Sequence, residues 1–329
     1  MELAVLDLGS TTFHLQHFQV EANGRLTSCL DLKECTSLGA QVFADGFIDA
    51  HSRAVALQAV DALLNASNQR GFTHRAIVAT SAIRSAKNGR ALAREIEARH
   101  DSHVKILEPS EEARLAYLGQ LGCAELIGKR FAMVDLGGGS VELSVGRDQQ
   151  ILYTESLPLG AVRMRVATAA QGGSAQQLEL LGQLLREQLV GPLSAVQGLE
   201  PELIVFGSGS ARAARKLLMR ESAQPGKTGP LATASFRSEL KALYPRTPNE
   251  LIALGVESAR STTVLTSATI MLQILELLGA ESALVSGCGL RDGVASEMWR
   301  KLASRNSGVF RSAAPREAAV RRSVRDALG

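Results

Sequence analysis

The chain has 329 residues, of which 45% are hydrophobic and 21% are charged, a balance typical of a globular protein that buries a core. We find no apolar run long enough to cross a bilayer and no secretory signal, so we expect a cytoplasmic protein without a membrane contact. The net charge is only +3 and aromatic residues make up 4%, which disfavours a specific nucleic-acid surface with stacked bases.

The first part of the chain is predicted to alternate strands and helices. Apolar runs predict strands at 3–8, 13–20, 27–37, 76–79 and 104–107. Helices are expected at about 52–69, after an N-cap at Asn88, and at 110–121 with Ser110 as the N-cap.

The same order then restarts. Strands are predicted at 131–136, 141–146, 151–157, 203–206 and 283–285, and helices at about 174–190, 211–219, 235–243, 261–278 and from Leu290 onward. Residues 222–232 hold several Pro and Gly residues and predict an exposed loop.

This repeat predicts an internal duplication with two α/β domains and a cleft between them. We place the domains at 1–122 and 123–304, with a basic and flexible tail at 305–329. The tail holds six arginines against two acidic residues, a pattern that also attracts polyanions. The four cysteines have neither zinc-ligand spacing nor a disulfide framework, so we expect them to be reduced.

Two similar turns carry the strongest chemical signal. Each lies between two strand-like runs, and they read Asp7-Leu8-Gly9-Ser10 and Asp135-Leu136-Gly137-Gly138-Gly139-Ser140. Glycine lets backbone N–H groups approach an anion closely, and an Asp can hold a hydrated divalent cation. Two such turns facing each other would clamp phosphate and metal between similar halves.

Two further segments have both a structural and a functional interpretation. Thr80, Ser81 and Arg84 follow a strand, and Arg84 offers a bidentate contact to a phosphoryl group. Glu111 and Glu112 complement the dipole of a helix, but one of them is also a candidate base for activating water. The spacing alone does not choose between these readings.

Two strand-loop-helix segments of the second half also suit phosphate binding. They begin at Gly207-Ser208-Gly209-Ser210 and at Gly287-Cys288-Gly289, and the second is followed by Arg291. A helix N-terminus after such a loop offers unpaired N–H groups to an anion.

Together these segments resemble the exopolyphosphatase / guanosine-pentaphosphate phosphohydrolase (Ppx/GppA) family in its short two-domain form, over about residues 1–300. The two Asp-Gly turns look like the phosphate motifs of that family, and the segments 79–88 and 111–115 match two more of its motifs. Segments 156–163 and 289–293 are also similar to the family pattern. The resemblance implies an α/β fold of duplicated actin-like, ribonuclease H-like domains with an interdomain cleft.

The sequence departs from the family pattern at several positions. Thr11 and Thr12 stand where Asn-Ser is usual, Pro109 stands where Gly commonly precedes the Glu pair, and Asp292 replaces a Glu. Ser267 replaces a glycine in the long helix of the second domain. From the resemblance we also expect no counterpart of the C-terminal helical domains of long members, which leaves processivity and chain-length preference undecided by the sequence. No departure removes a carboxylate or arginine needed for chemistry, so we expect activity.

The resemblance implies hydrolysis of a terminal phosphoanhydride bond. Glu112, which falls on the catalytic Glu of the family, would activate water, and Arg84 would neutralise charge on the transferred group. Mg²⁺ or another divalent cation would be held through water by Asp7, Asp135 and Glu142, with a structural role as the alternative for Glu142. The expected phosphate-binding residues are Gly9, Ser10, Thr11, Ser81, Gly137, Gly138, Gly139, Ser140, Gly207, Ser208 and Arg291. Arg163 and Arg212 are weaker candidates for binding the rest of the polyanion.

The resemblance favours inorganic polyphosphate as the substrate, with guanosine pentaphosphate (pppGpp) as the alternative and ppGpp as a candidate regulator. Two other classes are a kinase or ATPase on the same scaffold and a non-catalytic alarmone or polyphosphate sensor. The motif at 79–88 and the Glu pair speak against a kinase, and retention of the carboxylates speaks against a sensor. A homodimer is also expected from the resemblance.

Overall fold

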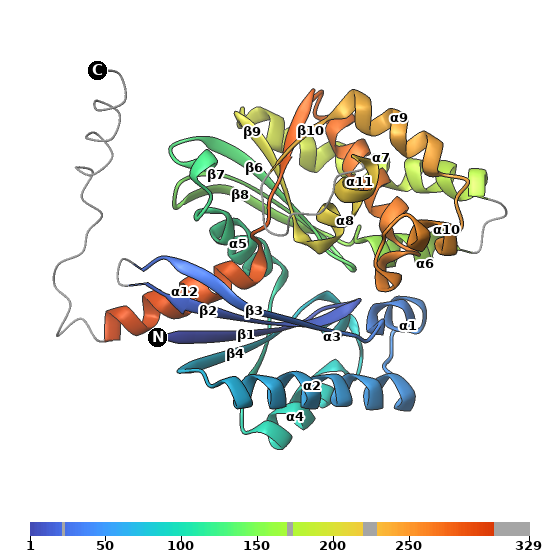
Figure 1. The fold of residues 1–329 in the computed structure, drawn as a ribbon. Helices are drawn as coiled ribbons and strands as arrows, with labels where there is room; N and C mark the ends of the chain where they lie inside the picture. Colours follow the sequence, from blue (N-terminus) through green and yellow to red (C-terminus); the bar gives the residue numbers. More distant parts are fainter. Residues whose placement is uncertain (22–23, 170–173, 220–228, 306–329) are drawn as a thin grey trace, which may run out of the picture.

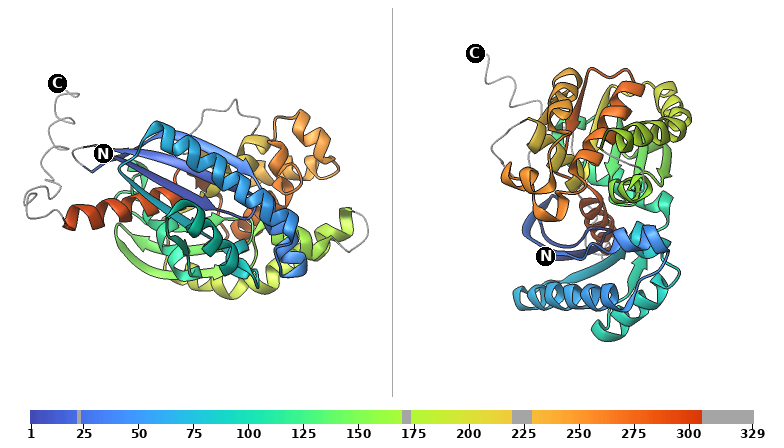
Figure 2. Two further views of the ribbon diagram at one scale, coloured as in Figure 1. Left: turned by 90° about the horizontal axis from the view of Figure 1, so that it is seen from below. Right: turned by 90° about the vertical axis from the view of Figure 1, so that its right-hand side faces the viewer.

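Two β-sheets with helices packed on them form the framework of the protein (Figure 1 and Figure 2). The computed structural model describes residues 1–21, 24–169, 174–219 and 229–305. The first sheet has the strand order β3-β2-β1-β4-β5, and the second has the order β10-β11-β9-β6-β7-β8. In each sheet the first three strands pair antiparallel, and two later strands, β4 and β5 in the first sheet and β9 and β11 in the second, join in parallel. The second sheet adds β10, which pairs antiparallel with β11 at its edge. This repeated order confirms the duplicated ribonuclease H-like α/β fold.

The first half contains five strands and five helices in the described residues. They are β1 Glu2–Leu8, β2 Thr12–Val20, β3 Leu26–Cys35, α1 Leu38–Asp45, α2 Ala50–Arg70, β4 His74–Ala79, α3 Ser81–Ser85, α4 Gly89–His100, β5 Val104–Ile106 and α5 Pro109–Gln120.

The second half continues the pattern. Its elements are β6 Arg130–Leu136, β7 Val141–Arg147, β8 Gln150–Leu157, α6 Ala161–Thr168, α7 Ser174–Gly198, β9 Leu203–Gly207, α8 Ser208–Leu218, β10 Gly229–Ala232, α9 Thr233–Leu243, α10 Pro248–Ala253, α11 Val264–Leu277, β11 Ser282–Val285 and α12 Leu290–Arg305.

Side-chain alternation along the first strand of each half sets the position of its aspartate. Successive side chains of a strand point to opposite faces of the sheet. Leu3 and Val5 of β1 pack against α12, and Asp7 follows them on the same face. Phe131 and Met133 of β6 pack with α5, and Asp135 follows them in the same way. Both aspartates therefore end a face that is turned toward the junction between the halves.

The helices α5 and α12 cross between the two sheets. Leu290, Val294 and Ala295 of α12 pack on the first sheet, although α12 ends the second half of the sequence. Figure 1 shows α12 running along β1 and β2 beside α5. A methyl group on Gly119 of α5 would lie 2.0 Å from the Gly289 carbonyl oxygen, and one on Gly293 would lie 1.8 Å from the Leu115 carbonyl oxygen. Glycine is therefore required at both positions.

Most predicted elements are present, with corrections at their ends. The predicted loop at 222–232 is wrong for residues 229–232, which form β10, and residues 222–228 lie outside the described residues. Helix α5 begins at Pro109, so Ser110 is not its N-cap, and proline suits this first position because its missing N–H would be unpaired there. The helix expected at 261–278 begins at Val264, after a 3₁₀ turn at Ser258–Arg260.

Four short helices were not predicted: α1, α3, α6 and α10. Asn88 does occupy the N-cap position of α4, but its side chain hydrogen-bonds to the backbone of Ile48 instead of capping the helix. Residues 306–329 of the expected tail lie outside the described residues. The domain limits at 122 and 304 stay a prediction, and the packing of α12 on the first sheet bears on where a functional domain ends. In the part of the chain that the structure describes, no helix is long and apolar enough to cross a membrane.

Candidate active site

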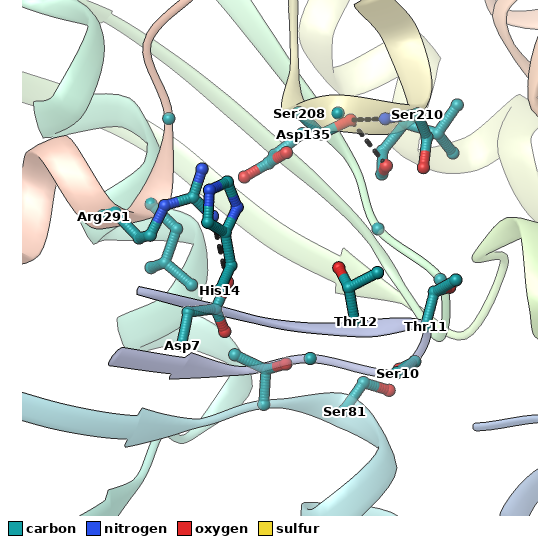
Figure 3. Close-up of a pocket in the computed structure, with 18 of the residues that line it drawn as sticks. Asp7, Ser10, Thr11, Thr12, His14, Ser81, Asp135, Ser208, Ser210 and Arg291 are labelled. Carbon is teal, nitrogen blue, oxygen red and sulfur yellow. Dashed lines mark hydrogen bonds and ion pairs between the residues drawn. The ribbon is translucent and has the colours of Figure 1, made fainter. Parts of the chain in front are cut away.

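A cavity of about 120 Å³ lies between the halves, and both Asp-Gly turns line it. Figure 3 shows Asp7 and the Ser10, Thr11, Thr12 and Ser81 side chains on the side of the first sheet, with Asp135, Ser208 and Ser210 across from them. Of the predicted phosphate-binding residues, all but Gly207 line the cavity. A methyl group on Gly207 would lie 2.3 Å from Met133, so this glycine serves close packing behind the site.

The second turn is held in place by α6. The Gly137 carbonyl accepts a hydrogen bond from the Ala161 N–H (3.1 Å), and the Gly138 carbonyl accepts one from the Val162 N–H (2.8 Å). Arg163 Nε donates to the Gly139 carbonyl oxygen (2.8 Å). In a trans peptide the C=O and the following N–H point in opposite directions. The N–H groups after these carbonyls are thus turned away from α6, in a turn that lines the cavity, which suits them to bind an anion.

The first turn is fixed in a related way by the segment that follows β3. The Ser10 carbonyl accepts from the Gly39 N–H (2.7 Å), and the Thr11 carbonyl accepts from the Ser37 N–H (3.0 Å). The two turns also approach each other across the cavity, because a methyl group on Gly138 would lie 2.9 Å from Ser10 Cβ. The repeated turns therefore face each other, as the sequence predicts.

Four carboxylates line the same cavity: Asp7, Glu112, Asp135 and Glu142, of which Asp7 is half-buried and the other three are buried. Burial raises the pKa of Glu112 to about 7, although the Arg84 guanidinium opposes the shift. Burial and then the Asp7 carboxylate raise the pKa of Asp135 to about 6. Burial, together with the Glu112 and Asp135 carboxylates, raises the pKa of Glu142 well above its ordinary value. Unpaired charges are costly in such a site, so the cluster favours protons or a bound cation.

The residues predicted to hold a metal fit a divalent cation in part. Burial raises the pKa of Asp7, and its Oδ1 atom is buried without a hydrogen-bond partner. Asp135 lines the cavity on the opposite side. Within the described residues no group of three or more His, Cys, Asp or Glu is close enough to hold a metal ion by itself. Mg²⁺ usually keeps several waters and binds one or two carboxylates plus substrate phosphates, and this donor set suits that mode.

Glu112 and Arg84, the predicted catalytic residues, form an ion pair. Arg84 Nη1 donates to Glu112 Oε2 (2.7 Å) and also to the Leu107 carbonyl oxygen (2.7 Å). Glu112 lies in the first turn of α5 and lines the cavity, whereas Arg84 does not line it. Arg84 therefore acts on the cavity indirectly, through its ion pair with Glu112.

Basic side chains of α8 and α12 also line the cavity. Arg291 Nη1 lies 3.4 Å from Asp7 Oδ2, and its Nε donates to Gln16 (2.9 Å). Arg212 donates to the Gly287 carbonyl oxygen (2.7 Å). These contacts place positive charge beside the phosphate-binding turns, where a polyanion would be stabilised.

Sequence reasoning missed three residues of the lining: His14, Lys33 and Arg260. His14 pairs with Asp7 in the register of the first hairpin, and its Nε2 lies 2.6 Å from Asp31 Oδ1. Burial lowers the pKa of His14 to about 4, with Arg291 adding to the shift. The alternation of the hairpin was a signal for His14. Lys33 pairs with His14 on the neighbouring strand β3, so the same alternation extends to it. No sequence signal marks Arg260, which comes from the 3₁₀ turn at Ser258–Arg260.

Comparison with known proteins identifies the family. The model of the Ppx/GppA phosphatase family matches residues 18–302. The chain belongs to the Ppx/GppA phosphatase family. It is 26% identical over 317 residues to Exopolyphosphatase 1 of Mycobacterium tuberculosis (strain ATCC 25618 / H37Rv), across 94% of this chain and 90% of that protein. It is also 26% identical to Exopolyphosphatase 1 of Mycobacterium leprae (strain TN), across 100% of this chain and 95% of the relative. Membership in the Ppx/GppA family and these relatives indicate a phosphoanhydride hydrolase.

Solved structures of Ppx/GppA proteins have the same fold. An exopolyphosphatase from Cytophaga hutchinsonii superposes with a TM-score of 0.83 at 23% identity, over 92% of this chain and 98% of that chain. The Aquifex aeolicus member of the family gives a TM-score of 0.74 at 24% identity, over 93% and 99% of the two chains. The resemblance inferred from the motifs and the fold that it implied are both confirmed.

Proposed function

We propose that this protein hydrolyses the terminal phosphoanhydride bond of inorganic polyphosphate and releases orthophosphate. The observation that carries the proposal is the pair of facing turns, whose carbonyls accept hydrogen bonds from neighbouring N–H groups, beside four carboxylates of which three are buried. The exopolyphosphatase relatives, matched over nine-tenths or more of their length, support polyphosphate as the substrate.

The terminal phosphoryl group would bind between the turns. Peptide N–H groups of 138–140 would donate to its oxygens, and the hydroxyls of Ser10 and Ser81 would line the opposite side. A divalent cation, which we propose to be Mg²⁺, would be held through bound waters by Asp7, Asp135 and Glu142 and would neutralise charge on the phosphate oxygens. The elevated pKa values of these carboxylates support a cation, because one would relieve their mutual repulsion.

Glu112 is the proposed base. A water oxygen attacks the terminal phosphorus, one proton of that water passes to Glu112, and the bond from phosphorus to the bridging oxygen breaks. Orthophosphate and a chain shortened by one phosphate leave. With a pKa of about 7, Glu112 is poised to accept a proton near neutral pH. Arg84 holds the carboxylate in place at 2.7 Å and supplies positive charge near the transferred group.

The lining of the cavity favours an inorganic chain over a guanosine nucleotide. Among the described residues that line it there is no Phe, Tyr or Trp on which a guanine base would stack. Lys33, Arg212 and Arg260 add positive charge to the lining, which suits a chain of phosphates. A guanosine pentaphosphate would present the same terminal group to the turns, so the assay must include it. A cytoplasmic location and a homodimer stay predictions.

The test measures orthophosphate release from long-chain polyphosphate and, in parallel, from guanosine pentaphosphate, each with Mg²⁺. We expect faster release from polyphosphate. Glu112→Gln is isosteric and should lower kcat by about 1,000-fold while leaving the circular dichroism spectrum unchanged. Glu111→Gln, the adjacent residue paired with Lys105 at the surface, is the matched control and should retain activity. Release from guanosine pentaphosphate alone would make that nucleotide the substrate in place of polyphosphate. Near-normal turnover by Glu112→Gln would show that Glu112 is not the base.

A further inference from the structure

Arg163 lies at a second junction between the halves, on the side of the cavity away from the crossing of α5 and α12. Figure 1 shows α6 of the second half next to α1 of the first half, while α5 and α12 cross on the other side. Arg163 is in the first turn of α6 and does not line the cavity. The prediction that Arg163 binds the polyanion is therefore not supported by its position, and we consider another role for it.

The guanidinium of Arg163 is held by both halves at once. Its Nε donates to the Gly139 carbonyl oxygen of the second phosphate-binding turn (2.8 Å). Its Nη2 donates to Ser85 Oγ on α3 of the first half (3.1 Å). Its Cζ lies 4.0 Å from the centroid of the Phe43 ring on α1, which is cation–π geometry. We call Arg163, Ser85 and Phe43 the cleft latch.

The cleft latch orients one peptide of the second turn, the peptide between Gly139 and Ser140. The Gly137 and Gly138 carbonyls are fixed by backbone N–H groups of α6, within the second half. The Gly139 carbonyl is fixed by the Arg163 side chain. Because the peptide is trans and planar, holding that carbonyl also fixes the direction of the Ser140 N–H. The first half steadies Arg163 through Ser85 and Phe43, so this direction depends on contact between the halves.

We propose that Arg163 is a positioning residue that aims the Ser140 N–H at the phosphoryl group when the two halves meet. The proposal rests on the proposed hydrolase function. It explains why a cation at position 163 is paired with an aromatic ring and a hydroxyl of the opposite half. Phe43 also packs against the turn, since a methyl group on Gly139 would lie 2.4 Å from Phe43 Cζ. Closure and assembly of the phosphate-binding turn are thereby the same event.

Steady-state kinetics on polyphosphate test the latch. Arg163→Gln should lower kcat by about tenfold with KM changed less than about twofold, because the peptide loses its orientation while substrate ligands remain. Arg163→Lys keeps the charge but lacks the planar fork, and it should not restore kcat. Phe43→Leu should reduce kcat in the same way, and the double variant Phe43→Leu with Arg163→Gln should be no worse than Arg163→Gln alone. Ser85→Ala should give a smaller loss of the same kind.

The matched control is Arg165→Gln, which removes the same charge from an exposed position of the same helix. It should leave kcat and KM unchanged. Wild-type kcat in Arg163→Gln, rescue by lysine, or a large rise in KM at constant kcat would each overturn the proposal, and the last would make Arg163 a direct substrate ligand. Equal melting temperatures of the variants would show that a lost fold is not the cause.

A second readout does not depend on turnover. Hydrogen exchange of 137–142 and of α1 should be faster in Arg163→Gln than in wild type, with Mg²⁺ and tripolyphosphate present. Arg165→Gln should exchange like wild type. If wild type releases no orthophosphate from any substrate, the hydrolase proposal fails, but the exchange comparison still tests the latch. Identical exchange in Arg163→Gln and wild type would overturn the latch even if the enzyme is active.

Discussion

The two halves present the same hairpin to the cavity but place different chemistry at the equivalent position. In the first half His14 pairs with Asp7, and in the second half Glu142 pairs with Asp135. His14 is held by Asp31, whereas Glu142 accepts a hydrogen bond from Ser156 (2.9 Å). The first aspartate also has Arg291 3.4 Å away, so charge in that half is offset, while the second half gathers carboxylates. One repeated scaffold has thus become a charge-balanced half and a half suited to a cation.

Of the variants that compare the two halves, the largest effect should come from replacing the residue that pairs with each aspartate. Glu142→Gln should lower kcat/KM by about 100-fold and raise the Mg²⁺ concentration needed for half-maximal activity about tenfold, because a cation-binding oxygen loses its charge. His14→Gln should lower kcat/KM by less than about tenfold and leave the Mg²⁺ requirement unchanged. Titration of activity with Mg²⁺ measures both. Equal shifts of the Mg²⁺ requirement in the two variants would show that the two halves do not differ in their role toward the cation.

The second-largest loss of activity is expected from substitutions of two glycines in the second turn, one of which faces the opposite half. A methyl group on Gly139 would lie 2.4 Å from Ser81 Oγ of the opposite half, whereas one on Gly137 would lie 3.1 Å from its nearest neighbour, the Ser140 carbonyl oxygen within the same turn. Gly139→Ala should therefore separate the halves and lower kcat/KM by about 30-fold, in the range expected for a displacement of reacting groups.

The matched variant Gly137→Ala should lose less than about threefold, since only a small local adjustment is needed. Thermal melting of both variants provides the folding control. Similar losses in the two variants would indicate that the turn, rather than the approach of the halves, is sensitive to added volume.

The smallest effect concerns stability without divalent cations. Burial raises the pKa of Glu112 from 4.5 to about 7, so the native state binds more protons than the unfolded chain between these values. The stability associated with the protonated Glu112 is complete below about pH 4.5 and is lost as the pH rises through 7. His14 acts in the opposite direction between about pH 4 and pH 6.5, because burial lowers its pKa. The contribution of Glu112 to the free energy of unfolding must therefore be obtained by comparing wild type with a Glu112 variant.

Urea unfolding of wild type and Glu112→Gln at pH 5 and pH 8 measures that difference. Glu112→Gln should gain stability relative to wild type as the pH rises, by on the order of 2 kcal/mol, because the variant has no carboxylate to ionise. A difference that stays constant, or that shrinks with rising pH, would show that Glu112 is already ionised at little cost in the folded protein.

Local patterns in the sequence were sufficient for the architecture and for much of the candidate site. Period-2 alternation and apolar runs predicted the strands, and the repeated Asp-Gly turns predicted that two phosphate-binding hairpins face each other. The elements that the sequence missed were short helices such as α1 and α6, and the strand β10, whose glycine and proline are typical of an open loop but which pairs with β11. Short elements carry too few periodic residues to stand out, and an edge strand tolerates proline.

The sequence by itself determined the duplication, the order of the elements and the residue types at the turns, because these depend on neighbours within a few positions. Only the tertiary structure decided which distant groups meet. It joined Arg84 to Glu112, set Arg291 beside Asp7, and brought Arg163 of the second half onto Phe43 of the first. Each of these pairs spans a long stretch of chain, and the contact forms only when the sheets and the crossing helices α5 and α12 have packed. Burial in that packing, rather than residue type, also raises the pKa values of the carboxylates in the cavity.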